Sequence, residues 1–229
     1  ASNRKDDDLF SLNIPPHLRP NYVATISGYL LDFNNQPIGA TITWEDLDKN
    51  KIIMKSKSNI EDGSFFMILP LGKKYGYYID KNGYFPISNN IDLTDTITPQ
   101  NINTDVQIVT IDDMIINEIS IPLKNLFFES GKTRLTSSSI PELKRIAKII
   151  IENNLKVELS GHTDNVYKEE YNLELSKERA EAVKDYLLRL GCSSDKIITI
   201  GYGESKPLNE NKNKQERRIN RRVEFKFIE

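Results

Sequence analysis

The stretch from Val157 to Arg179 constrains the fold most strongly, because it combines strand, polar turn and helix patterns in immediate succession. Alternating apolar residues that begin at Val157 predict a short strand, and a polar turn at 161–165 follows it. A helical pattern then runs from about 172 to 190. A strand–loop–helix unit of this kind can bring Asp164, just past the strand, against Arg179 on the helix.

These two side chains carry opposite charges that suit one kind of ligand. An amino-acid head group would place its ammonium on Asp164 and its carboxylate on Arg179. The planar guanidinium of Arg179 can bind a carboxylate through two hydrogen bonds, as a lysine cannot. The structural alternatives are that Asp164 caps its turn or pairs with a local base, and that Arg179 forms an ion pair with Asp164 or Glu178.

Several short motifs occur in order along the second half of the chain: GHTD at 161–164, YN at 171–172, LS at 175–176, RA at 179–180 and NRRVEF at 220–225. Together they resemble the C-terminal domain of outer membrane protein A and its relatives, from about Leu123 to the C-terminus. The OmpA-like family binds peptidoglycan. The resemblance implies that Asp164 holds the amine of diaminopimelate in a stem peptide and that Arg179 holds its carboxylate.

The same resemblance adds further candidate ligand-binding residues. It places one arginine of the NRR motif near the ligand, and strand alternation lets only Arg221 or Arg222 face a given site, so we choose Arg221. Thr163 and Asn165 can offer backbone N–H groups to a carboxylate. Asn172 can contact the ligand or cap the start of the helix, and capping is the simpler interpretation.

The sequence predicts no catalytic residue, metal site or cofactor. Its two histidines and one cysteine lie far apart, whereas an amidase or carboxypeptidase needs a metal cluster or an activated nucleophile. His162 is interpreted as structural.

Gly131 stands where some OmpA-like relatives have an asparagine that contacts the ligand, so no side chain can contact the ligand from that position. An envelope scaffold without ligand binding remains the main alternative to a peptidoglycan-binding protein, and a peptidoglycan-processing enzyme is the weaker one.

Composition narrows the class of protein. The formal net charge of −2 over 229 residues gives no basic field for nucleic acid. No apolar run approaches the roughly 18 residues of a transmembrane helix. The polar, acidic residues 1–10 contain no signal peptide, so an exported protein would be represented here by its mature part. The lone Cys192 excludes an intramolecular disulfide and fits the cytosol slightly better than an oxidising compartment.

We expect two domains after a proline-rich and acidic tail or linker at 1–20. Residues 21–97 predict an all-β sandwich, with strands near 23–31, 38–44, 51–58, 64–69 and 75–79 separated by turn signals. Their motif order resembles the carboxypeptidase regulatory-like (transthyretin-like) sandwich. Such a module usually lacks a catalytic site and contacts partners. Its aromatic residues either fill the core or line a binding face.

A connecting segment at 98–120 and an α/β domain at 121–229 complete the expected organisation. The Asn-rich run at 100–103 is typical of a loop, and 106–111 and 115–121 are typical of strands. The α/β domain reads β-α-β-α-β-β, a mixed sheet with helices packed on it, with strands at 123–128, 157–160, 196–202 and 222–228. Ser139 and Glu142 have the spacing of a capping box at the first helix.

The pairing of these two domains resembles the C-terminal part of envelope proteins of the Bacteroidetes type, including the peptidoglycan-binding component of the type IX secretion machinery. The resemblance implies a periplasmic location in association with the outer membrane. Its expected partners are peptidoglycan and, through the β-sandwich, envelope or secretion-machinery proteins.

Overall fold

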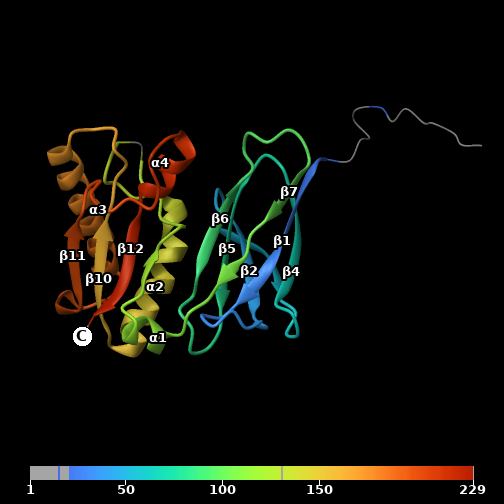
Figure 1. The fold of residues 1–229 in the computed structure, drawn as a ribbon, viewed down its shortest axis with the longest axis horizontal. Helices are drawn as coiled ribbons and strands as arrows, with labels where there is room; N and C mark the ends of the chain where they lie inside the picture. Colours follow the sequence, from blue (N-terminus) through green and yellow to red (C-terminus); the bar gives the residue numbers. More distant parts are fainter. Residues whose placement is uncertain (1–14, 16–20, 130, 229) are drawn as a thin grey trace, which may run out of the picture.

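The computed structural model describes residues 15, 21–129 and 131–228. A region of two β-sheets is followed by a domain in which helices pack on a third sheet (Figure 1). The tail predicted at 1–20 lies outside the described residues except for Pro15.

The N-terminal β region consists of two four-stranded sheets around one apolar core. The first sheet contains β1 (Val23–Leu31), β4 (Ser64–Pro70), β7 (Gln100–Asn103) and β8 (Val106–Gln107). The second has the order β3-β2-β5-β6, with β2 (Thr41–Asp46), β3 (Lys51–Lys57), β5 (Lys74–Asp80) and β6 (Ser88–Asp92). At its centre the rings of Trp44 and Tyr77 lie 4.9 Å apart.

The five strands predicted for this region are present, but the Asn-rich run at 100–103 was wrongly predicted as a loop. It forms β7, which pairs in parallel with β1. Asn101 accepts a hydrogen bond from Thr25 Oγ1 (2.5 Å), and Asn103 accepts one from Ser27 Oγ (2.9 Å). Side-chain ladders of this kind offset the low strand propensity of asparagine. Strands β7 and β8 therefore place the first part of the predicted connecting segment in the sheet of β1.

The rest of the connecting segment is helical where a strand was predicted. Helix α1 (Ile111–Ile116) begins at Thr110, whose side chain accepts a hydrogen bond from the Asp113 N–H. This N-cap explains why the apolar run turns into a helix. The strand that follows is only β9 (Ser120–Pro122), and 123–128, also predicted as a strand, forms no regular strand.

The C-terminal domain has the predicted mixed sheet with helices packed on it, but its order from β9 onward is β-α-β-α-β-α-β, because α4 (Lys214–Asn220) lies between the last two strands. Strand β10 (Lys156–Gly161) pairs in parallel with β11 (Ile197–Gly201) and antiparallel with β12 (Val223–Ile228), which in turn pairs with β9. The other helices are α2 (Ile140–Asn153) and α3 (Glu169–Arg189), with short 3-10 helices at Ser137–Ser139 and Ser194–Lys196.

One apolar core joins the sheet to α2 and α3. The alternating Val223, Phe225 and Phe227 of β12 are buried in it, as predicted. On the edge strand β11, Ile197 is the buried residue, whereas Ile198 is 45% exposed.

The predicted capping box at α2 is also wrong. Ser139 Oγ instead accepts a hydrogen bond from the Phe127 N–H (2.8 Å) and donates one to the Phe127 carbonyl oxygen (3.0 Å). The serine side chain therefore fastens the irregular segment before α2 to the helix, and it makes no cap hydrogen bond.

Helix α2 lies between the C-terminal sheet and the N-terminal β region (Figure 1). Its Glu142 accepts a hydrogen bond from Ser88 Oγ of β6, and Arg145 bridges Glu142 (2.8 Å) and Glu45 of β2 (3.1 Å). The Arg145 guanidinium also lies 4.1 Å from the centre of the Tyr78 ring. Buried ionic and apolar contacts therefore hold the two parts together.

Within the described residues, no helix combines the length and apolar character needed to cross a membrane.

Candidate functional site

Asp164 lies three residues beyond the end of β10, on backbone that is still held by neighbouring segments. The N–H of His162 donates to the Arg222 carbonyl oxygen, and the N–H of Thr163 donates to that of Gly203, both at 2.9 Å. The Asp164 side chain is 7% exposed. Its Oδ1 accepts a hydrogen bond from the Val166 N–H (3.2 Å), which closes the turn around the carboxylate. The carboxylate is thus held in place from both sides.

Arg179 projects from the third turn of α3 and is only 8% exposed. Its guanidinium carbon lies 5.2 Å from the centre of the Phe128 ring. Within the described residues its one hydrogen bond runs from Nε to the Lys132 carbonyl oxygen (3.4 Å). Burial lowers the pKa of Arg179, and Arg221 lowers it further while Asp164 opposes the change. The guanidinium is therefore a desolvated cation that a carboxylate would stabilise.

Arg221 is the cation that pairs with Asp164, with Nη1 lying 2.6 Å from Oδ2. Arg222 also lines the cleft, but its Nε donates to Glu224 Oε1 (2.7 Å). The chosen member of the arginine pair is thus the one that contacts Asp164, although both precede β12 and strand alternation does not keep Arg222 out of the cleft. In the described part of the chain Asp164 and Arg179 form no direct ion pair, so the structural alternative suggested for Arg179 does not occur there.

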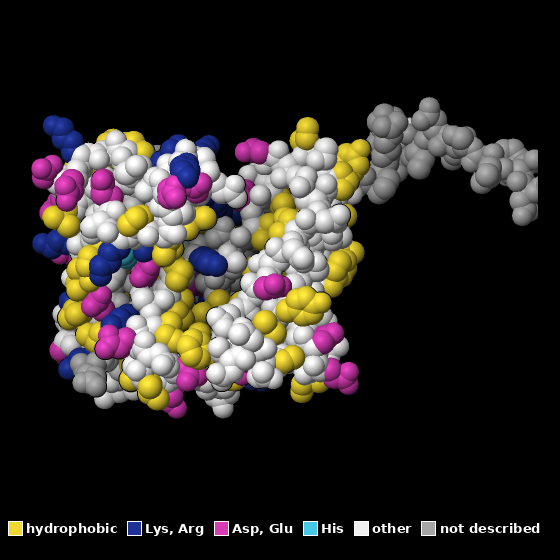
Figure 2. Space-filling model, in the orientation of Figure 1, with side chains coloured by type: hydrophobic (Ala, Val, Ile, Leu, Met, Phe, Trp, Pro, Cys, Tyr) yellow, Lys and Arg dark blue, Asp and Glu magenta, His cyan; other side chains and the backbone are white. Residues whose placement is uncertain are grey.

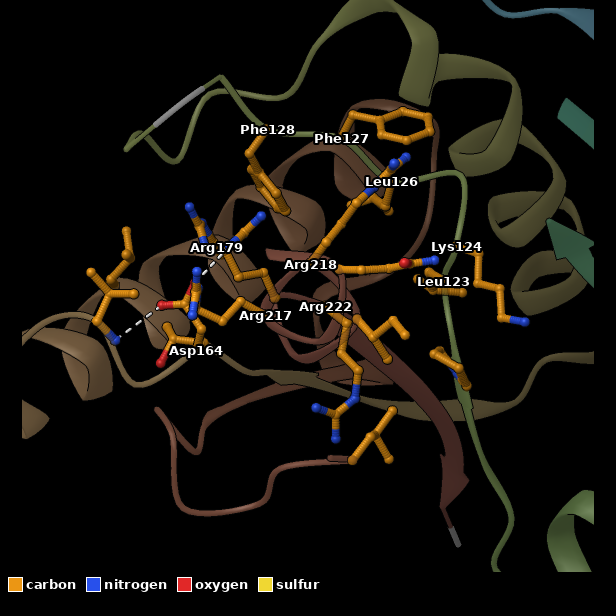
Figure 3. Close-up of a pocket in the computed structure, with 18 of the residues that line it drawn as sticks. Leu123, Lys124, Leu126, Phe127, Phe128, Asp164, Arg179, Arg217, Arg218 and Arg222 are labelled. Carbon is orange, nitrogen blue, oxygen red and sulfur yellow. Dashed lines mark hydrogen bonds and ion pairs between the residues drawn. The ribbon is translucent and has the colours of Figure 1, made fainter. Parts of the chain in front are cut away.

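Asp164, Arg179 and Arg221 line one cleft of about 1010 Å³. In Figure 3, Asp164 and Arg179 lie at one end of the group drawn, and Lys124 lies at the other. Figure 2 shows that this face of the molecule is hollowed between its two parts, with Lys and Arg side chains in the hollow. The cleft therefore contains carboxylates and several guanidinium groups.

Residues 127–221 match the model of the OmpA family. The C-terminal domain is OmpA-like. Outer membrane porin F of Pseudomonas fluorescens is 36% identical over 98 residues, which cover 42% of this chain and 30% of the relative. The peptidoglycan-associated lipoprotein of Pseudomonas putida is 33% identical over 104 residues, or 45% of this chain and 63% of the relative.

A third relative is named as a peptidoglycan-binding protein. The peptidoglycan-binding protein ArfA of Mycobacterium bovis is 40% identical over 84 residues, which cover 36% of this chain and 26% of the relative. The chain thus spans less than two thirds of the length of each of these three relatives.

Three further residues predicted to bind ligand occupy different positions around the cleft of the OmpA-like domain. Thr163 lines it, and its N–H donates to the Gly203 carbonyl oxygen in this structure, so its donation to a ligand stays a prediction. Asn165 is exposed and lies outside the lining. Asn172 lines the cleft and is fully buried, and its side-chain amide donates to the carbonyl oxygens of Asp164 (3.0 Å) and Tyr167 (3.1 Å).

Asn172 does not cap α3, contrary to the simpler interpretation. The helix begins earlier, at Glu169, so Asn172 lies within its first turn. From there its amide also donates to Glu204 Oε2 (2.5 Å). The residue therefore positions the loop that carries Asp164.

His162 of the OmpA-like domain lies outside the cleft lining. It is 1% exposed and stacks on Tyr202 with ring centroids 5.5 Å apart. Burial lowers its pKa to about 4, with a further contribution from Arg222. The imidazole is therefore neutral at pH 7, in keeping with the structural role predicted for it.

Sequence reasoning missed several residues that line the cleft: Lys124, Phe128, Arg217 and Arg218 of the C-terminal domain, and Asn89, Asn90 and Asp92 of β6. The run Arg217-Arg218 beside the NRR motif was a visible basic signal. Phe128 was predicted only as part of a strand. In the described residues, no group of three or more His, Cys, Asp or Glu side chains is arranged to hold a metal ion.

Proposed function

We propose that the C-terminal domain binds the diaminopimelate head group of a peptidoglycan stem peptide, without catalysis, and anchors an envelope assembly to the cell wall. The observation that carries this proposal is the convergence of Asp164, Arg179 and Arg221 on one cleft. The ligand ammonium would lie on Asp164 and the ligand carboxylate on Arg179. The names of the peptidoglycan-associated and peptidoglycan-binding relatives support the same substrate class.

The electrostatics favour a zwitterion over a simple anion or cation. Asp164 is already paired with Arg221, so an arriving ammonium would share the carboxylate with that arginine. Arg179 has Phe128 on one side and, among the residues that the structure describes, a single weak hydrogen bond through Nε, so its Nη groups can accept a ligand carboxylate as their partner. A ligand with both groups on one carbon satisfies both residues at once.

The cellular context forms part of the proposal. Relatives named as outer membrane and peptidoglycan-associated proteins support a periplasmic location in association with the outer membrane. The N-terminal β region would be a carboxypeptidase regulatory-like module that contacts envelope or type IX secretion-machinery proteins. A scaffold that does not bind ligand is the alternative, and the open cleft beside Arg179, which forms no ion pair with any described residue, argues against it.

Retention on purified peptidoglycan sacculi tests the proposal. Asp164→Ala and Arg179→Ala should each abolish retention, because the loss of one partner of a desolvated charge pair costs on the order of 2–5 kcal/mol of binding. Arg189→Ala is the matched control, since Arg189 is exposed on the same helix and outside the cleft. Circular dichroism should show that all three variants remain folded. Wild-type retention by both cleft variants would refute the proposal.

Competition with soluble peptides tests the head group. Stem peptides that contain diaminopimelate should displace the protein from sacculi at lower concentration than stem peptides that contain lysine. Lysine lacks the second carboxylate, so Arg179 would lose its partner. Equal competition by the two peptides would show that Arg179 does not bind the second carboxylate of diaminopimelate.

A further inference from the structure

The cleft is built by both parts of the molecule. Asn89, Asn90 and Asp92 of β6 line it together with the residues of the OmpA-like domain. Asn90 Nδ2 donates to the Lys124 carbonyl oxygen (2.6 Å), and Arg218 Nη2 donates to Asn90 Oδ1 (3.1 Å). The N-terminal β region therefore forms one wall of the cleft and holds a cationic side chain of α4.

The charges at this wall do not balance. Asp92 faces two cations, Lys74 at 3.9 Å and Arg218 at 3.8 Å, and both distances exceed that of a hydrogen bond. Burial raises the pKa of Asp92, but hydrogen bonds from Thr94 and the charges of Lys74 and Arg218 lower it overall. The carboxylate is therefore ionised and shared, which leaves this end of the cleft with excess positive charge.

Arg218 is accessible to a ligand and close to the head-group site. Its side chain is 49% exposed. It precedes Arg221 by three residues at the end of α4, a spacing that puts two side chains on one helix face with Cβ atoms roughly 5–6 Å apart. Arg221 in turn holds Asp164. A ligand seated at Asp164 and Arg179 thus needs only a short extension to reach Arg218.

We infer that Arg218, held by Asn90 of β6, binds a second carboxylate of the ligand and that the N-terminal β region is part of the binding site. This inference rests on the proposed function. In a stem peptide that ends in diaminopimelate, the head group is one end of that residue and the terminal backbone carboxylate is the other. Arg218 recognises the terminal carboxylate.

Two synthetic ligands separate this carboxylate from the head group. One is a stem tripeptide that ends in diaminopimelate with a free terminal carboxylate, and the other is the same peptide with that carboxylate converted to a carboxamide. Titration calorimetry should give the wild-type protein an affinity for the acid about 5- to 10-fold higher than for the amide, as expected for one charge-assisted contact near the surface.

Arg218→Ala should reduce this ratio to about 1. Asn90→Ala should reduce it part of the way, because Arg218 would lose its hydrogen bond to β6. Lys214→Ala is the matched control, since it removes a cation from the same helix outside the cleft and should keep the wild-type ratio. Asp164→Ala should weaken both peptides together.

Different failures have different meanings. If both peptides bind the wild-type protein equally and Asp164→Ala weakens both, the inference about Arg218 is overturned and the proposed function stands. An unchanged ratio in Arg218→Ala overturns the inference as well. An unchanged ratio in Asn90→Ala removes the β region from the binding site. If neither peptide binds the wild-type protein, the proposed function itself fails.

Discussion

The Arg179 guanidinium packs near the Phe128 ring on one side and lines the cleft on the other. An aromatic face stabilises a guanidinium without using its hydrogen-bond donors. Asp164, by contrast, is held by the Val166 N–H and by Arg221. One side chain of the proposed head-group site is thus positioned by packing and the other by hydrogen bonds. This division explains how two opposite charges can lie in one cleft without pairing directly.

His162 makes the stability of the fold depend on pH. Its folded-state pKa of about 4 lies below its ordinary value of 6.5, so the unfolded chain binds the proton more readily. Stability should therefore fall as pH drops from about 6.5 toward 4, with a loss of about 2 kcal/mol between pH 7 and pH 5. Urea unfolding of the wild type and of His162→Gln at these two pH values measures the effect. A variant that loses as much stability as the wild type would exclude His162 as the cause.

Among the elements, β10 and α3 pack unusually closely where the site is built. Gly161 and Gly201 are register partners on β10 and β11. A Cβ on Gly161 would lie 1.9 Å from the Ser176 carbonyl oxygen, and one on Gly201 would lie 2.7 Å from the Lys177 N atom. The missing side chains let α3 approach the strand ends. That approach sets the position of Arg179 relative to the loop of Asp164.

Gly161→Ala should therefore destabilise the OmpA-like domain by about 1–3 kcal/mol, because backbone atoms of α3 would have to move. Gly39→Ala is the matched control. Its added Cβ would meet Ile60, a residue that is 78% exposed and can yield, so the expected change is within about 0.5 kcal/mol. Thermal unfolding compares the two variants. Equal melting temperatures would contradict the close packing described above.

Periodicity predicted the elements whose apolar faces are local in sequence, and it failed where distant partners decide. The alternation of Val223, Phe225 and Phe227 correctly predicted β12 and its inward face. The Asn-rich run at 100–103 was predicted as a loop because its side-chain hydrogen bonds to β1 are not visible in the local sequence. Ser139 and Glu142 have the spacing of a capping box, but the Ser139 hydroxyl accepts a hydrogen bond from the Phe127 N–H instead. In each failure the local pattern was genuine, and a tertiary contact overrode it.

The same limit applies to the site. Asp164, Arg179 and Arg221 were predictable because short motifs mark them, and the structure places all three on the cleft. Arg218 and Asn90 are 128 residues apart in sequence, and no pattern within either segment connects them. Their contact depends on how α2 docks against the β region. That docking is a property of the whole molecule.

At the scale of the whole molecule, Arg145 joins the two parts through carboxylates on either side. Glu142 is 3% and Glu45 6% exposed, and both face its guanidinium. Burial alone would lower the pKa of Arg145, but the two glutamates raise it. A charge triad this deeply buried stabilises the interface only while all three members are present.

Arg145→Ala should cost about 3–5 kcal/mol, because two buried carboxylates would lose their partner. It should also uncouple the two parts. Trp44, the one tryptophan of the chain, reports on the β region, whereas far-UV circular dichroism reports chiefly on the helices of the OmpA-like domain. The two probes should give coincident urea transitions in the wild type and separate transitions in the variant.

Arg134→Ala is the control for this prediction. Its side chain is 80% exposed and its ion pair with Glu129 is 3.5 Å long, so its removal should change stability by less than about 1 kcal/mol. Coincident transitions in Arg145→Ala would show that the apolar contacts around α2 couple the two parts without the triad.

The position of α2 has a mechanical consequence. If the OmpA-like domain binds the cell wall and the β region binds an envelope partner, a pulling force between them acts across the interface that α2 forms with the β region. The packed side chains of α2 and the ion pairs of Arg145 would then bear this force together. The backbone that connects β8 to α1 would be stretched only after these interface contacts had broken.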